Sequence, residues 1–280
     1  MAKPWFFRGL PFNPSLKMIR EALSGVSYLV MLVLLFTGVV VKAQNDVTSE
    51  PANSEWSFLA EPYLMFPNMK GTVGLRNLPD AQVAASSGDI FNNLKMGFML
   101  NLEASNAKWA VGSDLLYMSL GQDVEPGILI ESGEVNTKQL GWEPFGFYRM
   151  TSWLELGLGA LVNSINSDLR INRKEIGGEM ILLKASKTET WLDPMILARI
   201  KSQSGQKFAY QFRGEIGGFG IGSDLAWQIQ AYAGYRFSAL FEMTAGYRII
   251  SLDYESGSGQ NRFKYDVDTS GPVIRFGFNF

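Results

Sequence analysis

Apolar and polar residues alternate one by one along most of the chain beyond residue 55. The clearest run covers residues 225–237, where apolar side chains recur at every second position from Leu225 to Phe237. A period of two predicts a β-strand with one apolar face. The run is longer than the about five or six residues of an average strand. It suits a tilted strand that crosses a lipid bilayer, for which about 9–11 residues suffice.

The same alternation recurs along the chain and predicts ten strands of one closed antiparallel barrel. The expected strands cover residues 55–66, 94–104, 109–121, 138–149, 152–165, 191–202, 207–217, 224–237, 240–254 and 262–280. Eight or twelve strands are the alternatives, the larger number because residues 67–93 and 166–190 are long enough to contain further strands. The predicted fold class is therefore all-β, with the barrel domain at residues 55–280.

The connections between the expected strands alternate strictly between short and longer ones. The short connections are residues 105–108, 149–152, 202–206 and 237–239, and the longer ones are residues 67–93, 122–137, 166–190, 217–223 and 255–261. Outer-membrane barrels show this asymmetry, with short periplasmic turns and longer external loops. An even number of strands then places both ends of the barrel in the periplasm.

Aromatic side chains gather beside the short turns and predict the interfacial girdle of a membrane barrel. They are Trp56, Trp109, Tyr148, Trp153, Phe208, Phe237, Phe241 and Phe280. The last strand ends on Phe280 itself, and pairing with the first strand would leave it no free edge. Because the apolar residues change face between Val267 and Ile274, we expect a bulge at residues 269–272, where Pro272 cannot donate to the ladder.

Residues 1–43 differ from the rest of the chain and predict a secretory signal peptide. A basic segment precedes the apolar run 28–41, and small residues favour cleavage after Ala43. The 14 apolar residues fall short of the about 20 that a transmembrane helix needs, so a membrane anchor is the alternative. Translation could also start at Met18.

Composition excludes several classes of function. The chain has no cysteine and no histidine, which rules out disulfides, a lipid-anchored cysteine, catalytic triads built on histidine and imidazole metal sites. Without residues 1–43 the net charge falls from −2 to −6, and no basic stripe for nucleic acid remains. We expect no catalytic, cofactor-binding or metal-binding residues, since no carboxylate pair stands out by its spacing. Residues 44–54 are polar and predict a flexible leader.

Charged side chains lie on the strand face opposite the apolar one, and we expect them to line the lumen. They are Glu61, Lys95, Glu103, Asp114, Glu143, Arg149, Glu155, Asp193, Arg199, Arg213, Glu215, Arg236, Glu242, Arg248 and Arg275. Eight acidic residues against seven basic ones nearly balance. Charges inside a barrel are costly unless they are paired or hydrated. Two interpretations stay open, namely ion pairs that fill the lumen and a narrow pore lined by both signs.

Residues 214–224, GEIGGFGIGSD, resemble a phosphate-binding loop in their glycine content. A dinucleotide site needs a helix after such a loop, and here a strand follows. We expect a glycine-rich turn that is either external or folded inward.

Residues 86–94, SSGDIFNNL, predict a short helix between two strands. Asp89 is placed to cap this helix, whose apolar face would carry Ile90, Phe91 and Leu94. The helix either restricts the mouth of the barrel or lies outside it.

Several segments resemble known outer-membrane proteins. The C-terminal strand with Phe276, Phe278 and Phe280 is similar to the assembly signal of bacterial outer-membrane barrels. The segments GDIFNNLKMGFMLNLEASNAKWAVGSDLLYMSL, GEIGGFGIGSDLAWQ and AGYRIISLDY resemble a widespread group of small outer-membrane β-barrel proteins of unassigned function. The resemblance implies a barrel in the outer membrane of a Gram-negative bacterium, with membrane lipid and the barrel-assembly machinery as partners. It implies no activity.

We therefore expect a non-enzymatic outer-membrane barrel with a structural or surface-interaction role, whose lumen is filled by charge pairs. The alternative is a narrow porin-like channel for small polar solutes or ions, and an envelope-modifying enzyme is a third class. The sequence indicates neither the ligand nor the oligomeric state.

Overall fold

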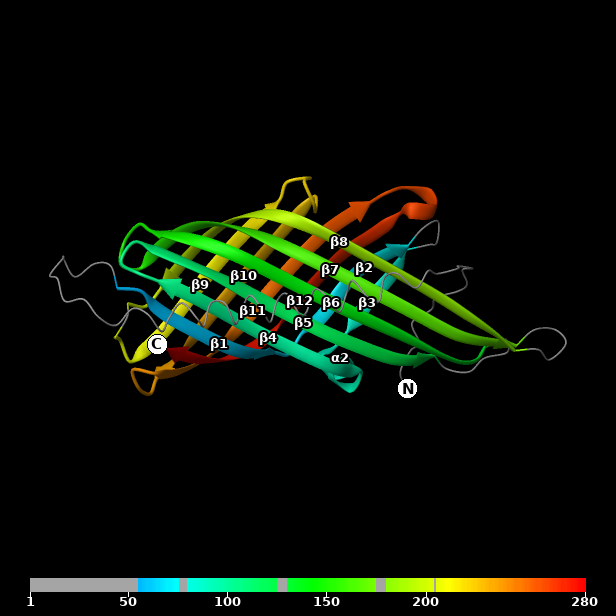
Figure 1. Cartoon of the computed structure of the whole chain (residues 1–280), viewed down its shortest axis with the longest axis horizontal. Helices are drawn as coiled ribbons and strands as arrows, with labels where there is room; N and C mark the ends of the chain where they lie inside the picture. Colours follow the sequence, from blue (N-terminus) through cyan, green and yellow to red (C-terminus); the bar gives the residue numbers. More distant parts are fainter. Residues whose placement is uncertain (1–54, 76–79, 125–129, 175–179, 204) are drawn as a thin grey trace, which may run out of the picture.

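The computed structural model describes residues 55–75, 80–124, 130–174, 180–203 and 205–280, so the predicted signal peptide and leader lie outside the described residues. These residues form one barrel of antiparallel strands, with one short helix and one 3-10 turn between strands (Figure 1). The elements are β1 (Ser57–Met65), β2 (Asn68–Leu75), β3 (Ala81–Ala85), α2 (Ser87–Asn92), β4 (Leu94–Ser105), β5 (Trp109–Val124), β6 (Ile130–Arg149), β7 (Leu154–Lys174), β8 (Met180–Lys201), β9 (Phe208–Gly218), β10 (Leu225–Arg236), β11 (Phe241–Ser256), η2 (Gly259–Asn261) and β12 (Phe263–Asn279).

β1 and β2 together make a single first strand of the barrel. Both pair with β12 in one register, from Leu59 opposite Asn279 to Leu75 opposite Phe263. The seam between β1 and β12 closes the sheet, and the short β3 pairs with β2. The wall therefore consists of the first strand and β4 to β12. The predicted closed antiparallel barrel of ten strands is confirmed.

The two ends of the barrel differ in their connections. The tight turns that join β4 to β5, β6 to β7, β8 to β9 and β10 to β11 lie at one end, together with Ser57 and Asn279 (Figure 1). We call this the turn end and the opposite one the hairpin end. β6, β7 and β8 reach farthest toward the hairpin end and contain 20, 21 and 22 residues. The segments 122–137 and 166–190, expected as loops, are largely strand.

The strands are longer than predicted. The prediction followed alternating apolar residues, and the outward faces of the strands become polar beyond the predicted boundaries. On β7 the outward residues are apolar up to Val162, and Ser164, Asn166 and Asp168 follow them. The hydroxyls of Ser164 and Thr190 lie 2.9 Å apart across β7 and β8. Such polar cross-strand pairs stabilise a sheet that faces water. A search for alternating apolar residues does not detect strands of this kind.

The bulge expected at residues 269–272 is absent, and this prediction was wrong. β12 keeps one register with β11 from Phe278 opposite Phe241 to Phe263 opposite Ser256. Apolar residues change face along β12 because its outer side is apolar near the turn end, whereas its inner side is apolar toward the hairpin end. Near the turn end the outward side carries apolar Phe278, whereas toward the hairpin end Tyr265 points inward and Asp266 outward.

Exposed apolar side chains form a belt around the outside of the barrel. Members from different strands include Leu64, Phe98, Trp142, Leu158, Ile196, Phe212, Ile229 and Tyr247. The predicted girdle residues are also exposed at the turn end, except Phe241, which is half-buried. Among the described residues, no helix is long and apolar enough to cross a membrane.

Deleting Phe280 is expected to lower the free energy of unfolding by about 1–3 kcal/mol, since two net hydrogen bonds of about 0.5–1.5 kcal/mol each are lost. The Phe280 N–H donates to Phe58 O at 2.8 Å, and the Phe58 N–H donates to Phe280 O at 3.1 Å. Urea unfolding of the protein in vesicles measures the effect. Phe280→Leu keeps both backbone bonds and is the control; equal losses in both variants would contradict the backbone explanation.

Candidate functional site

The charged residues predicted for the lumen are all among the described residues, and fourteen of the fifteen lie on its inner side. Lys95 is the exception and lies on the outer face, where its Nζ is 2.5 Å from Glu134 Oε1 and 2.6 Å from Asn136 Oδ1. A register shift between Leu94 and Met96 turns Lys95 away from the lumen. The prediction for Lys95 was wrong because simple alternation cannot foresee a bulge.

Arg199 is the centre of an ion-pair cluster near the turn end. It donates to Glu155 Oε2 at 2.6 Å and to Glu103 Oε1 at 3.1 Å. Glu103 belongs to β4 on the opposite side of the lumen from β8, so this pair crosses the barrel. Lys201 lies 3.2 Å from Glu155, and Arg149 donates to the same carboxylate at 3.0 Å. We call these five residues the Arg199 cluster.

A second group lies between β6, β9 and β10 and joins two carboxylates through Arg213. Arg213 donates to Glu143 Oε1 at 2.8 Å and also contacts Glu215. The Gln228 amide donates to Glu143 Oε2 at 2.7 Å and to Glu215 as well. The Arg213 guanidinium lies 4.3 Å from the ring centroid of Phe145. The group fills the middle of the lumen with polar side chains that bind one another.

Two more arginines, Arg248 of β11 and Arg275 of β12, bind side chains of the first strand inside the lumen. Arg248 lies 2.7 Å from Asp114 and donates to Tyr63 OH at 2.9 Å. Arg275 lies 3.3 Å from Glu61 and 4.0 Å from the ring centroid of Tyr232. Together with Glu242, which binds Arg236 at 2.6 Å, these pairs give a cation to seven of the eight predicted lumen carboxylates.

Asp193 is the eighth carboxylate, and it binds the turn between β9 and β10 instead of a cation. It accepts from the Ser223 N–H at 2.5 Å, the Ser223 hydroxyl at 2.9 Å and Trp191 Nε1 at 3.1 Å. Both Asp193 and Ser223 are fully buried. A Cβ at Gly222 would lie 2.3 Å from Leu192 O, so this approach requires glycine. Part of the glycine-rich turn thus folds inward, one of the two alternatives left open by the sequence.

Asp193→Leu is expected to destabilise the barrel by about 1–3 kcal/mol, because the buried Ser223 N–H loses its acceptor. Hydrogen exchange at the Ser223 amide should speed up at the same time. Asp224→Leu changes the neighbouring exposed carboxylate and serves as the control. Unchanged protection of Ser223 in the Asp193 variant would contradict the proposed anchor.

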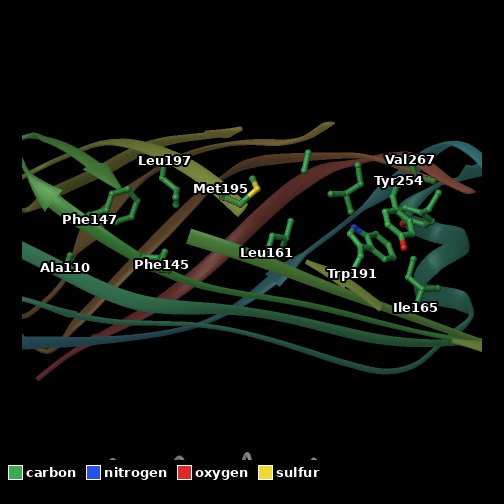
Figure 2. Close-up of a cluster of buried hydrophobic side chains, with 13 residues drawn as sticks. Ala110, Phe145, Phe147, Leu161, Ile165, Trp191, Met195, Leu197, Tyr254 and Val267 are labelled. Atoms are coloured by element: carbon green, nitrogen blue, oxygen red, sulfur yellow. The ribbon is translucent and has the colours of Figure 1, made fainter. Parts of the chain in front are cut away.

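Toward the hairpin end the lumen becomes apolar. Figure 2 shows a continuous series of buried side chains from Phe147 and Phe145 to Trp191 and Tyr254. Trp191 of β8 and Tyr254 of β11 stack with ring centroids 4.1 Å apart and planes at 7°. β9 and β10 end closer to the turn end than Trp191 and Tyr254 do. The stack therefore connects β8 to β11 where the two intervening strands have ended.

A cavity of about 40 Å³ lies in the lumen between the charged groups and the aromatic stack. Its lining includes Met65, Met99 and Met118, which belong to the first strand, β4 and β5. Polar groups, among them Arg248 and Gln228, also line it. The cavity therefore has a mixed apolar and polar lining.

The barrel wall is interrupted beside this cavity. β4 pairs with β1 only as far as Leu100 opposite Pro62, and residues 94–99 are paired with β5 alone among the described strands. On the same edge of the first strand, β3 pairs with residues 69–73. We call the interval between these two pairings the wall gap; it faces residues 63–68 of the first strand.

α2 lies in the wall gap. The Ser87 N–H donates to Asn68 Oδ1 at 3.0 Å, and the ring of Phe91 lies 5.3 Å from that of Phe66. Ile90 is buried, whereas Phe91 is exposed. The predicted helix thus lies in the wall itself, which differs from both positions considered from the sequence.

α2 and the β2–β3 hairpin are each held by an exposed carboxylate. Hydrogen bonds from the Ser86 hydroxyl and N–H keep the pKa of Asp89 below its ordinary value and form a capping box. Hydrogen bonds from Arg262 likewise lower the pKa of Asp80. The contribution of each carboxylate to the stability of the fold is present above the ordinary carboxyl pKa and is lost as the pH falls through the lowered pKa.

Several lumen residues were not predicted from the sequence. Lys201 follows the alternation of β8 and could have been included, because it lies two residues beyond Arg199 on the same face. Trp191, Met195 and Leu197 were not recognised because outward Leu192 and Ile196 are apolar too, so no contrast marks the faces. Among the described residues, no group of three or more carboxylates is arranged for a metal ion.

No family model matches the chain, and no curated protein matches it by sequence. The outer membrane protease OmpT from Escherichia coli is 8% identical, with 84% of this chain and 99% of that chain covered and a TM-score of 0.48. The P. putida toluene transporter TodX is 9% identical, with 82% and 91% covered and a TM-score of 0.37. Ail, the attachment invasion locus protein of Yersinia pestis, is 13% identical, with 80% and 98% covered and a TM-score of 0.28.

The barrel's own geometry decides the fold. Ladder closure leaves the wall without a terminal edge strand at the seam, and the apolar belt ends in aromatic side chains at the turn end. The fold is that of an outer-membrane β-barrel. The resemblance to the group of unassigned function remains a prediction, since no family model matches the chain.

Proposed function

We propose that the protein is a non-conducting, non-enzymatic barrel of the Gram-negative outer membrane that acts through its hairpin end. The observation that carries the proposal is the layer of ion pairs across the lumen. Arg199 binds carboxylates on β4 and β7, and Arg213 binds Glu143 and Glu215. Because each of these side chains is almost fully buried, the layer supports a sealed interior.

The orientation follows from the connections. Tight turns are typical of the periplasmic side, so we place the turn end in the periplasm and the hairpin end outside. β6, β7 and β8 then extend beyond the apolar belt into the external water, where Arg170, Lys184 and Thr188 are exposed. This extended sheet, which also exposes Met180, Ile181 and Leu182 near its tip, suits contacts with other molecules at the cell surface.

The partners of the proposed barrel are membrane lipid around the belt and, during biogenesis, the barrel-assembly machinery. Phe276, Phe278 and Phe280 would be read by that machinery as the last strand is added at the seam. A non-enzymatic role is supported by the lumen chemistry, since the chain has no histidine to act as a base and Glu103 and Glu155 are both bound to cations.

Planar-bilayer conductance of the full chain, produced and processed in a Gram-negative host, tests the proposal. We expect no discrete current steps from protein whose gel mobility changes on heating, as a folded barrel requires. Discrete steps that shift in Glu215→Gln or Arg236→Gln would contradict a sealed lumen and favour the narrow channel. A porin in the same bilayer shows that silent records are not an artefact of reconstitution.

A further inference from the structure

The wall gap is bordered by apolar side chains on both of its sides. Outside, Leu64, Met96 and Phe98 are about half exposed, at 54%, 58% and 45%. Inside, Met65 and Met99 line the lumen cavity. Apolar side chains therefore lie both outside and inside the wall gap, where α2 packs against Phe66 and Asn68.

The first strand is adapted to leave this edge without a neighbouring strand. The Phe66 N–H donates to Pro272 O of β12 at 2.9 Å. Successive residues of a strand direct their N–H groups to opposite sides, so the next N–H along the chain would point into the wall gap. That residue is Pro67, which has no N–H to leave without a partner. At position 67 the strand therefore leaves no N–H without a partner in the wall gap.

α2 is a small wedge rather than a continuous part of the ladder. It is six residues long, and its contacts with the first strand include the Asn68–Ser87 hydrogen bond and the Phe66–Phe91 ring pair. A helix of this length has little stability of its own. Its displacement would expose the inner methionines without breaking the pairing between β4 and β5.

We propose that α2 is a movable wedge and that the cavity behind it receives the chain of a single-chain amphiphile from the outer leaflet. The proposal rests on the membrane placement given above, but not on the sealing of the lumen. Met65 and Met99 line the cavity and belong to the two edges of the wall gap, so they contact the chain, and Gln228 and Arg248 of the same lining bind the head. The cavity lining contains two carboxylates, Asp114 and Glu143, and one cation, Arg248. Because the single cation is matched by these carboxylates, the lining favours an uncharged head such as glycerol.

The cavity must enlarge to accept a chain. At about 40 Å³ it offers room for about three water molecules, at 10–15 Å³ each. Methionine side chains re-pack easily because they are unbranched and have three rotatable bonds. Met65, Met99 and Met118 together can therefore open a narrow channel for one linear chain, whereas a lipid with two chains would not fit.

Photo-labelling tests the proposal. The full-length protein is reconstituted in dilauroylphosphatidylcholine vesicles with a palmitoylglycerol that carries a diazirine in its chain, and labelled residues are mapped by mass spectrometry. We expect labels on Met65, Met99 and Met118 as well as on belt residues such as Leu158 and Ile196. Belt labels report membrane placement by themselves, so a failure of the proposed placement is distinguished from a failure of the cavity proposal.

A reversible lock provides the decisive comparison. The chain has no cysteine, and the 3.0 Å bond between Ser87 N and Asn68 Oδ1 brings the two residues within reach of a disulfide. Oxidised N68C/S87C should lose the label on the lumen methionines and regain it on reduction. S164C/T190C forms its disulfide on the outer face of β7 and β8, and its oxidation should leave the label on the lumen methionines unchanged.

Three results would overturn the proposal. They are labels confined to the belt in the reduced protein, lumen labels that persist in the oxidised lock, and equal lumen labelling by the palmitate anion, which would refute the uncharged head. Met99→Trp fills the cavity without a disulfide and should also lose lumen labels, which keeps the test valid if the cysteine pair does not form.

Discussion

Replacing Arg199 by methionine is expected to lower the free energy of unfolding by about 3 kcal/mol, at the lower end of the about 3–5 kcal/mol found when one partner of a buried ion pair is removed. The side chain is 3% exposed and binds both Glu103 of β4 and Glu155 of the neighbouring strand β7. Without it, two buried carboxylates face each other. Lys201 and Arg149 remain within reach of Glu155 and offset part of the loss.

Equilibrium unfolding in urea, with the barrel in lipid vesicles, measures this loss. Lys95→Met removes the exposed pair with Glu134 and should cost no more than about 1 kcal/mol. A triple variant, R199M/E103Q/E155L, removes the three buried charges together and should recover part of the stability, because no buried carboxylate is left without a cation and the remaining Arg149 and Lys201 are each 22% exposed. An Arg199 effect no larger than that of Lys95→Met would mean that the cluster is hydrated and contributes little.

The transmembrane part of the fold could be predicted from the sequence because lipid imposes a strict contrast between the two faces of a strand. Residues 224–237 were predicted as one strand, and β10 covers Leu225–Arg236. Where water lies on the outside, this contrast fades. The hairpin halves of β7 and β8 were therefore expected as a loop, although their cross-strand hydroxyl and amide pairs form a regular sheet.

Alternation predicts the face of a residue but not its partner across the barrel. Arg199 and Glu103 are 96 positions apart, and their contact depends on the stagger of strands on opposite sides of the lumen. The same limit applies to Asp193, which was expected beside cations and instead anchors Ser223. A bulge, as at Lys95, reverses even the assignment of the face.

The wall gap was not predictable by the same reasoning. The sequence shows the short helix at 86–94 and two prolines in the first strand, but each is compatible with an ordinary loop and an ordinary edge. Only the pairing shows that β4 leaves the first strand at Pro62 and that β3 takes up the same edge later. An interruption of the strand pairing produces no repeating pattern of apolar residues, so the sequence alone does not predict it.

Opening the sealed layer is expected to convert a silent barrel into a cation-selective pore. The variant is F147A/R199S/R213S. Phe147 is fully buried, and the guanidinium groups of Arg199 and Arg213 lie 4.2 Å and 5.4 Å from its ring centroid. These three side chains fill one level of the lumen. Their removal leaves Glu143 and Glu215 without a cation, and leaves Glu103 and Glu155 with Lys201 and Arg149 in place of Arg199.

Discrete current steps with a higher permeability for potassium than for chloride are therefore expected, since a ring of carboxylates attracts cations. The matched control, F212A/R170S/K184S, makes the same chemical changes on the outer face and should stay silent. A lumen variant that folds but remains silent would place the seal at the stack of Trp191 and Tyr254 instead. In that case the ion pairs serve to hold the strands together, and the aromatic residues beneath the hairpin end keep water and ions from passing.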